Sequence, residues 1–160
     1  MDEKTLEAIV QSVAKQVSAN ADMTLDVALK LSQKVKAKAK ELGVNAVVAV
    51  SNRAARPVLV ECMDDSFIAS YDIAVNKAFT VVALKMSTIE LKPLAQPGGS
   101  LYGIQFTNNG RIVIFGGGVP LYNKEGKIIG GLGVSGGSEE QDTALADFGG
   151  NSLSAIIKNL

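Results

Sequence analysis

Residues 111–142 read Arg111-Ile-Val-Ile-Phe-Gly-Gly-Gly-Val-Pro-Leu-Tyr-Asn-Lys-Glu-Gly-Lys-Ile-Ile-Gly-Gly-Leu-Gly-Val-Ser-Gly-Gly-Ser-Glu-Glu-Gln-Asp142. Because glycine enters positive φ freely and lets another backbone or a ligand approach closely, so many glycines beside strand-like runs predict a shaped backbone surface. This surface is the first candidate for a functional site. In it, Gly116, Gly117 and Gly118 would let the chain pass close to a flat ligand or to another subunit, or would form a plain bulge.

The same glycine block, residues 111–142, predicts the last strands of a sheet. Strand-like runs cover residues 111–115, 119–122 and 127–134, and the turn signal Asn123-Lys-Glu-Gly126 joins the second run to the third. A tight turn between two apolar runs indicates a β-hairpin, so the C-terminal half is expected to extend the sheet in antiparallel fashion.

The last helix has a specific start signal. Ser138 and Gln141 match a capping box, in which the serine hydroxyl accepts a hydrogen bond from the third helical amide and the glutamine reaches back. The amides of Gly136, Gly137 and Ser138 also offer a site for an anion at the helix N-terminus. A capped helix after a tight bend is the simpler interpretation of the same residues.

Two amphipathic helices are predicted before the sheet. Residues 3–18 and 25–42 carry apolar side chains at spacings of three and four. Thr24 is the expected N-cap of the second helix, which ends at Gly43. This helix also presents a row of lysines, either a basic docking face or, more simply, a solvated surface. The lysines are Lys30, Lys34 and Lys38, with Lys36 and Lys40 beside them.

A β-hairpin and a third helix follow. The β-branched runs 46–51 and 57–63 predict two strands, and Asp64, Asp65 and Ser66 offer N-caps for the helix. Residues 92–110 contain the proline, glycine and asparagine signals of an ordered loop. The inner face of the third helix is predicted to consist of Phe67, Tyr71, Ala74, Val75, Ala78, Phe79 and Val82. The order of elements predicts an α+β fold, a layered sandwich of helices on a mostly antiparallel sheet, and the length fits a single domain over residues 1–160.

Composition excludes several classes of protein. The 160 residues include 16 basic and 16 acidic side chains, so the balanced charge disfavours nucleic acid as a partner. No apolar run reaches the roughly 20 residues that span a bilayer, and the N-terminus lacks a secretory pattern, so we expect a cytoplasmic protein without a membrane partner. Cys62 is the single cysteine and histidine is absent, which argues against a disulfide, a zinc site and a histidine base.

Candidate chemical groups each have a simpler explanation. Asp72 and Lys77 are weak candidates for catalytic groups, although a surface network with Asn76 accounts for them. The string Gly131-Leu-Gly-Val-Ser-Gly136 matches a dinucleotide fingerprint but lacks the following βαβ unit and acidic residue, so no dinucleotide is expected. Side chains that resemble iron ligands are better explained by packing. They are Cys62, Met63, Met86 and Tyr102.

Several stretches together resemble the GlcG/HbpS-like family. They are Met63-Asp64, Ser70-Tyr-Asp-Ile-Ala-Val-Asn-Lys-Ala78, Ile114-Phe-Gly-Gly-Gly-Val-Pro-Leu121 and Gly130-Gly-Leu-Gly-Val-Ser-Gly-Gly-Ser-Glu-Glu-Gln-Asp142. The segments 96–104 and 107–118 look most like the branch that contains the C-terminal domain of the propanediol-utilisation cobalamin adenosyltransferase. The resemblance implies a layered α/β domain that forms homo-oligomers, binds haem or a related tetrapyrrole in some members, and works in the bacterial cytoplasm, near a diol-degrading microcompartment.

The chain departs from the family in the first hairpin. Many relatives have a Gly-Gly-His or Gly-Gly-Arg turn where this chain has Ala54-Ala-Arg56, and the haem ligation proposed for the branch uses histidine. Haem would therefore need a Met, Tyr, Cys, Lys or water ligand, or apolar and propionate contacts alone. The candidate cofactor-binding residues are Arg53, Arg56 and Lys77 for propionates, with Gly116, Gly117, Gly118 and Gln141 from the glycine block; no protein metal site is expected.

The leading hypothesis is an oligomeric, non-catalytic protein that binds a small ligand of the haem or corrinoid class in diol or glycolate metabolism. One alternative is an enzyme for a small carbonyl or hydroxy acid, with Lys77 and Asp72 as acid or base and residues 116–118 as an anion-holding backbone. Another alternative is a structural or assembly partner of a metabolic complex. The adenosyltransferase chemistry is not transferred, because the chain resembles only the accessory domain and lacks an ATP-phosphate motif.

Overall fold

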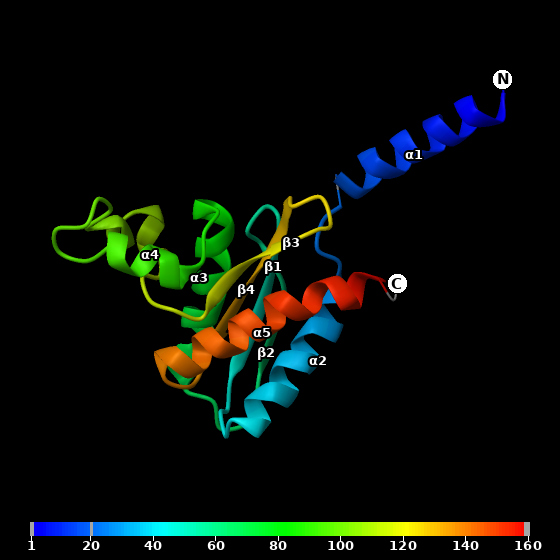
Figure 1. Ribbon diagram of the computed structural model, residues 1–160. Coiled ribbons are helices and arrows are strands. Elements are labelled where there is room, and N and C mark those ends of the chain that lie inside the picture. The colour runs from blue at the N-terminus through cyan, green and yellow to red at the C-terminus, as the bar shows by residue number, and fades with distance from the viewer. Residues whose placement is uncertain (1, 20, 159–160) are drawn as a thin grey trace.

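The computed structural model describes residues 2–19 and 21–158, and these form the expected α+β sandwich (Figure 1). Helices α2 and α5 cover one face of a four-stranded sheet and helix α3 covers the other. The described elements, in chain order, are α1 (Glu3–Ala19), α2 (Leu25–Glu41), β1 (Val47–Asn52), β2 (Pro57–Cys62), α3 (Ile68–Leu84), α4 (Thr88–Leu94), two 3-10 turns (Ile104–Phe106 and Asn108–Gly110), β3 (Gly118–Tyr122), β4 (Ile128–Ser135) and α5 (Glu139–Lys158).

The sheet is antiparallel throughout, with strand order β2-β1-β4-β3. Its central strand β1 is buried on both sides because its side chains alternate between two layers. Val48 and Val50 point into the core with α2 and α5, whereas Val47 and Ala49 pack against Ala74 and Ala78 of α3. Both layers of helices are therefore attached to the same strand.

Helix α3 lies directly on the backbone of β4. A Cβ atom added at Gly133 would overlap the carbonyl oxygen of Ala74, and one added at Gly131 would overlap that of Ala78. The two glycines thus permit an approach between helix and strand that any side chain would prevent. This close contact positions the candidate site, because the next turn of α3 carries Lys77.

Several local predictions are confirmed. The Thr24 hydroxyl accepts a hydrogen bond from the amide of Val27 and begins α2. The capping box at the start of α5 is formed in both directions, with Gln141 N donating to Ser138 Oγ and Ser138 N donating to Gln141 Oε1. The turn at Asn123–Gly126 joins β3 to β4 as a hairpin.

The predicted strand at 111–115 is wrong. Ile112 and Val113 are buried, but the amide of Val113 donates to the hydroxyl of Thr80 on α3 and not to a neighbouring strand. An apolar run that packs under a helix has the same sequence pattern as an edge strand, which explains the error. Strand β3 begins only at Gly118.

The predicted N-caps and inner face of α3 are also partly wrong. Residues 63–66 form a turn with Asp65 in the left-handed region, so α3 begins after Phe67 and has no side-chain cap. Phe67 and Tyr71, predicted to face inward, are exposed, while Lys77 is buried. Because the helix sits on a glycine-containing strand, Ala74 and Ala78 face the sheet, and the aromatic side chains of Phe67 and Tyr71 remain outside.

Helix α4, which was not predicted from the sequence, covers Thr88–Leu94 and so includes the first three residues of the expected loop. Its capping box consists of Ser87 and Glu90, and Pro93 lies inside its last turn. The S-x-x-E pattern was the sequence signal for this helix.

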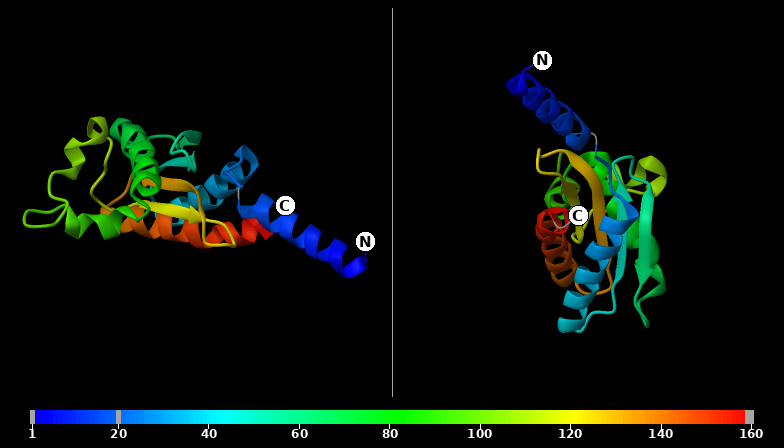
Figure 2. Two further views of the ribbon diagram at one scale, coloured as in Figure 1. Left: turned by 90° about the horizontal axis from the view of Figure 1, so that it is seen from above. Right: turned by 90° about the vertical axis from the view of Figure 1, so that its right-hand side faces the viewer.

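Helix α1 projects away from the rest of the molecule (Figures 1 and 2). It has the predicted amphipathic pattern, yet its described apolar side chains are exposed. Among residues 2–19 and 21–158, no helix combines the length and apolarity needed to cross a bilayer.

Candidate functional site

The polar centre of the glycine block is a buried ion pair between α3 and α5. The ammonium of Lys77 lies 3.1 Å from Oδ2 of Asp142, and the two side chains are 0% and 6% exposed. Lys77 also donates to the carbonyl oxygen of Val134 at 2.8 Å, and Oδ1 of Asp142 accepts the amide of Gly137. The pair therefore ties α3, the end of β4 and the first turn of α5 to one point.

The three glycines 116–118 cross over this ion pair. A Cβ atom at Gly117 would lie 2.6 Å from Nζ of Lys77, and the φ of this residue is +109°. Only glycine meets both requirements, the positive φ and the close approach, without strain. The sequence predicted a close approach to a flat ligand or to another subunit, or a plain bulge; in the structure the closely approached group is Lys77 of the same chain.

Two of the three amides of this crossing, those of Gly116 and Gly118, are already used within the chain. Gly116 N donates to Oε1 of Glu139, which also pairs with Lys92, and Gly118 N donates to the hydroxyl of Thr88. At the start of α5, Gly137 N and Ser138 N are satisfied by Asp142 and Gln141. These amides do not form a free anion site, so they give no support to an anion-holding backbone.

Burial and backbone hydrogen-bond donors shift the pKa values of two charged groups in this region. Burial lowers the pKa of the Lys77 ammonium, and the negative charge of Asp142 offsets part of that effect. The hydrogen bond from Gly116 N, helped by Lys92, lowers the pKa of Glu139. Phe115 covers the buried cation, with its ring centre 5.0 Å from Nζ of Lys77.

A pocket of about 240 Å³ opens beside this network, between the start of α3 and the start of α5. The hydroxyls of Ser70 and Ser135 face each other at 3.0 Å on its buried side, next to Asp142. Phe67 and Phe115 form its rim, and they are 70% and 40% exposed. The pocket thus combines a polar, hydrogen-bonded floor with an aromatic mouth, an arrangement that suits a ligand with a flat apolar body.

The structure separates the predicted cofactor residues into two groups. Lys77, Gly116, Gly117, Gly118 and Gln141 lie together at the glycine block. Arg53 and Arg56 lie at the opposite end of the sheet, where Asn52 pairs with Gly130. Val134, which contacts Lys77, is four residues further along β4, or about 13 Å at the usual strand rise. A single chain does not bring the two groups to one ligand.

The proposed pair Asp72 and Lys77 is not assembled either. Asp72 is exposed, whereas Lys77 turns inward and pairs with Asp142. The surface network with Asn76 is wrong for Lys77 for the same reason. Asp142 could not be assigned from the sequence, because its partner lies 65 residues away.

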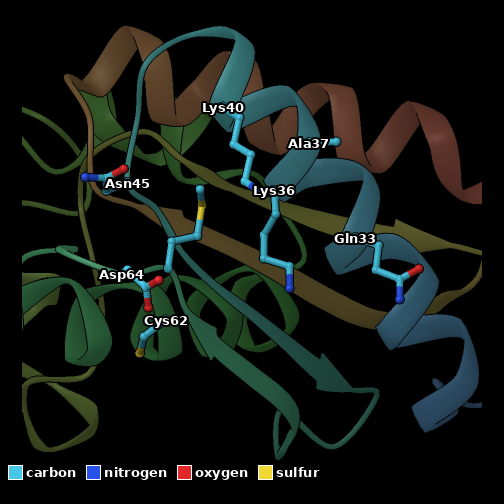
Figure 3. Close-up of a pocket in the computed structure, with 8 residues that line it drawn as sticks. Gln33, Lys36, Ala37, Lys40, Asn45, Cys62 and Asp64 are labelled. Atoms are coloured by element: carbon cyan, nitrogen blue, oxygen red, sulfur yellow. The ribbon is translucent and has the colours of Figure 1, made fainter.

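Another surface hollow lies between α2 and the end of β2 (Figure 3). Lys36 and Lys40 come from the helix, and Cys62 and Met63 from the strand end, around a groove of about 480 Å³. Lys36 already pairs with Glu61, and Met63 Sδ accepts the amide of Ala46. This α2–β2 groove offers cations and sulfur, but it lacks an aromatic wall.

The comparisons place this architecture in a known family. A family model described as haem degrading protein HbpS-like matches residues 23–149. The chain belongs to the HbpS-like family. The resemblance inferred from the sequence is thereby confirmed, and the matched range begins where Met23, buried and bonded to Ile129, attaches the chain to the sheet.

Relatives of this HbpS-like chain come from bacteria. An uncharacterized 15.0 kDa protein from the dhaT-dhaS intergenic region of Citrobacter freundii is 49% identical over 127 residues, which cover 79% of this chain and 89% of that protein. The corrinoid adenosyltransferase PduO of the same species is 41% identical over 110 residues, which cover 69% of this chain. The match spans only 32% of PduO, about a third of its length.

Solved structures agree with the family assignment. The Klebsiella pneumoniae protein ORFY has a TM-score of 0.81 and 43% identity, covering 84% of this chain and 92% of its own. The PduOC:heme complex has a TM-score of 0.78 and 35% identity, covering 82% and 95%. The α+β fold of the HbpS-like chain is thus confirmed by experimentally determined relatives.

Proposed function

We propose that this HbpS-like protein is an oligomeric binding protein for a tetrapyrrole, with haem as the first candidate, and that the macrocycle lies against the mouth of the glycine-block pocket. The observation that carries the proposal is the exposed apolar rim beside a closed polar floor. Phe67 and Phe115 on the rim are 70% and 40% exposed. Ile68 and Tyr71, which follow Phe67 on α3 outside the pocket lining, are 98% and 55% exposed. Apolar side chains gathered so prominently on a surface are typical of an interaction site.

The comparisons support the ligand class. The solved structure titled PduOC:heme complex shares 35% identity with this chain over 82% of its length. The description of the matching family, haem degrading protein HbpS-like, also names haem. Since fold alone does not determine function, the ligand is proposed from the rim residues together with these relatives.

The residues at the pocket fit a haem that is held mainly by apolar contact. The chain contains no histidine, so an iron ligand from the protein would be Tyr, Met, Cys or Lys. Tyr71 does not line the pocket, but it follows Phe67 by one turn of α3, and tyrosine is a known haem ligand. Lys92 is also outside the lining; it pairs with Glu139, which lines the pocket, and is the nearby cation that could meet a propionate. Lys77 lies beneath the crossing glycines and would act by shaping the pocket.

A hemin titration followed by the Soret band tests this proposal. The wild-type protein is expected to saturate at a fixed stoichiometry, and Phe67→Ser should weaken binding at least tenfold because it removes an aromatic wall. Phe106→Ser is the matched control, since Phe106 is 82% exposed and lies outside the pocket. An unsaturated, linear response of the wild-type protein, equal to that of albumin, would contradict the proposal.

Two further arms of the titration define the ligand. Cobalamin in place of hemin tests the corrinoid class, and saturation by cobalamin alone would move the assignment to that class. Tyr71→Phe tests the iron ligand: we expect a changed Soret position with binding retained. An unchanged spectrum would leave the apolar site but remove Tyr71 as ligand.

The wider setting is proposed from the relatives. We infer a homo-oligomer that works with enzymes of diol metabolism in the bacterial cytoplasm, near a microcompartment, because PduO contains a domain of this kind. A single domain over residues 1–160 remains a prediction of the sequence.

A further inference from the structure

Helix α1 has an apolar stripe that its own chain does not cover. Leu6, Ile9, Val10 and Val13 are between 46% and 57% exposed and lie on one side of the helix. The stripe is outside the family-matched range 23–149. Isolated helices of about this length are marginal in water, and most helices in proteins are stabilised by packing of an apolar face. We therefore expect the apolar stripe of α1 to pack against an apolar surface.

A fitting surface lies between α2 and α5. Ala37, Ala155 and Ile156 form the apolar floor of a groove of about 450 Å³, and Lys30 and Lys34 stand on its edge together with Gln33. Lys30 pairs with Asp26 on its own helix, while Lys34 has no ion pair among the residues that the structure describes. Within the described residues, Lys34 thus leaves an unpaired positive charge on the edge of this α2–α5 groove.

The charges of the helix and the groove are complementary. Glu3 and Glu7 are one turn apart and flank the apolar stripe of α1, whereas Lys4 and Lys15 lie on the opposite side. Lys30 and Lys34 repeat at the same one-turn spacing along α2. An amphipathic helix that lies in an apolar groove can therefore align its acidic edge with the basic edge of the groove.

We propose that α1 of one chain docks into the α2–α5 groove of a second copy of this chain. Helix α1 points away from its own body in all views, so its stripe is presented to another molecule (Figures 1 and 2). Met23 is buried and its amide donates to Ile129, which anchors the chain just after α1. The lysine row that the sequence offered as a docking face thus has a complementary surface in the same protein, the acidic edge of α1.

Cross-linking between two variants tests which surface covers the stripe. In a Cys62→Ser background, one preparation carries Val10→Cys and the other Ala37→Cys, and the two are mixed under mild oxidation. We expect a covalent dimer to form faster in the mixture than in either preparation alone. A dimer that forms as fast with Val10→Cys alone would mean that two α1 helices pair with each other, and it would overturn the proposal, as would no dimer.

A chain that carries both cysteines distinguishes docking on a second copy from folding back on the same chain. The expected product is again a covalent dimer or larger species. An internal cross-link that leaves only monomers, at the dilution where the mixed preparations react, would overturn the proposal.

Charge reversal gives an independent test in the intact chain. Glu7→Lys and Lys34→Glu should each lower the association constant measured by analytical ultracentrifugation several-fold, and the double variant should restore most of it. Gln11→Lys adds a positive charge to the opposite side of α1 and should leave association unchanged. If the double variant associates no better than the single variants, the charge match plays no part and the proposed docking is wrong.

Discussion

Helices α1 and α3 are each seventeen residues long, but they are related to the rest of the molecule in opposite ways. Helix α1 has a clear apolar stripe and leaves it exposed. Helix α3 carries a lysine in its middle and buries it against a strand of glycines. The comparison shows that periodicity predicts the helix, while the partner surface decides what is buried.

The reason for this difference is the shape of β4. Gly131 and Gly133 leave no side chain between the strand and α3, so the backbone of the helix lies on the sheet. Small residues are therefore enough to fill the space between α3 and β4. Lys77 extends from α3 to pair with Asp142 of α5, next to Gly117. Within residues 2–19 and 21–158, the apolar side chains described for α1 do not pack against a comparable surface of the same chain.

The largest effect is expected from breaking the ion pair under the glycine block. Lys77→Met leaves Asp142 buried without its cation and should lower the free energy of unfolding by about 3–5 kcal/mol. Denaturation in urea measures the change. The double variant Lys77→Met/Asp142→Asn removes both charges and keeps an acceptor for Gly137 N, so it should recover much of the loss. No recovery would show that the pair is not the cause.

A smaller but still large effect is expected where α3 touches β4. Gly133→Ala places a methyl group against the carbonyl of Ala74, and such overpacking costs about 1–3 kcal/mol or more. Ala8→Val is the control in α1, where the added carbons meet solvent and the melting temperature of the body should stay the same. Equal shifts in the two variants would contradict the close contact of α3 with the strand.

The pH dependence of stability gives a further test of the burial of Lys77 in α3. Because burial lowers the pKa of Lys77 in the folded state, the unfolded chain binds more protons between that lowered value and the ordinary value of 10.5. The free energy of unfolding should therefore rise with pH across this window in the wild-type protein relative to Lys77→Met. Urea titrations of both proteins at several alkaline pH values measure the difference, and parallel curves would mean that the pKa of Lys77 is not lowered.

The smallest effect on stability is expected from a substitution in α1. Leu6→Ser removes an exposed apolar side chain, so the free energy of unfolding of the sheet and the helices packed on it should change by less than about 0.5 kcal/mol. The same variant should reduce association between chains. A loss of several kcal/mol would show that α1 packs on its own body.

Local signals in the sequence predicted much of the fold. Thr24 and the pair Ser138 and Gln141 are caps that need only neighbours along the chain, and the structure forms both. The run 111–115 was misassigned because burial under α3 and pairing in a sheet demand the same apolar residues. The position of a strand edge depends on contacts that are distant in sequence.

The candidate site could be predicted only in part. The close backbone approach at Gly117 followed from glycine itself, but the group it approaches, Lys77, is distant in sequence. Arg53 and Arg56 were assigned to the same ligand through the family resemblance, and the antiparallel register puts them at the other end of the sheet. Phe67 was assigned to the core from its spacing, and its exposure became a clue to function only in three dimensions.

Hydrogen exchange of the intact protein with and without hemin tests the central proposal most directly, because it reports where the ligand lies. We expect added protection in the first turn of α3, around Phe67 and Tyr71, and in the segments around Phe115 and Ser135. Protection confined to the α2–β2 groove, around Lys40 and Met63, would contradict the assignment of the tetrapyrrole to the glycine-block pocket.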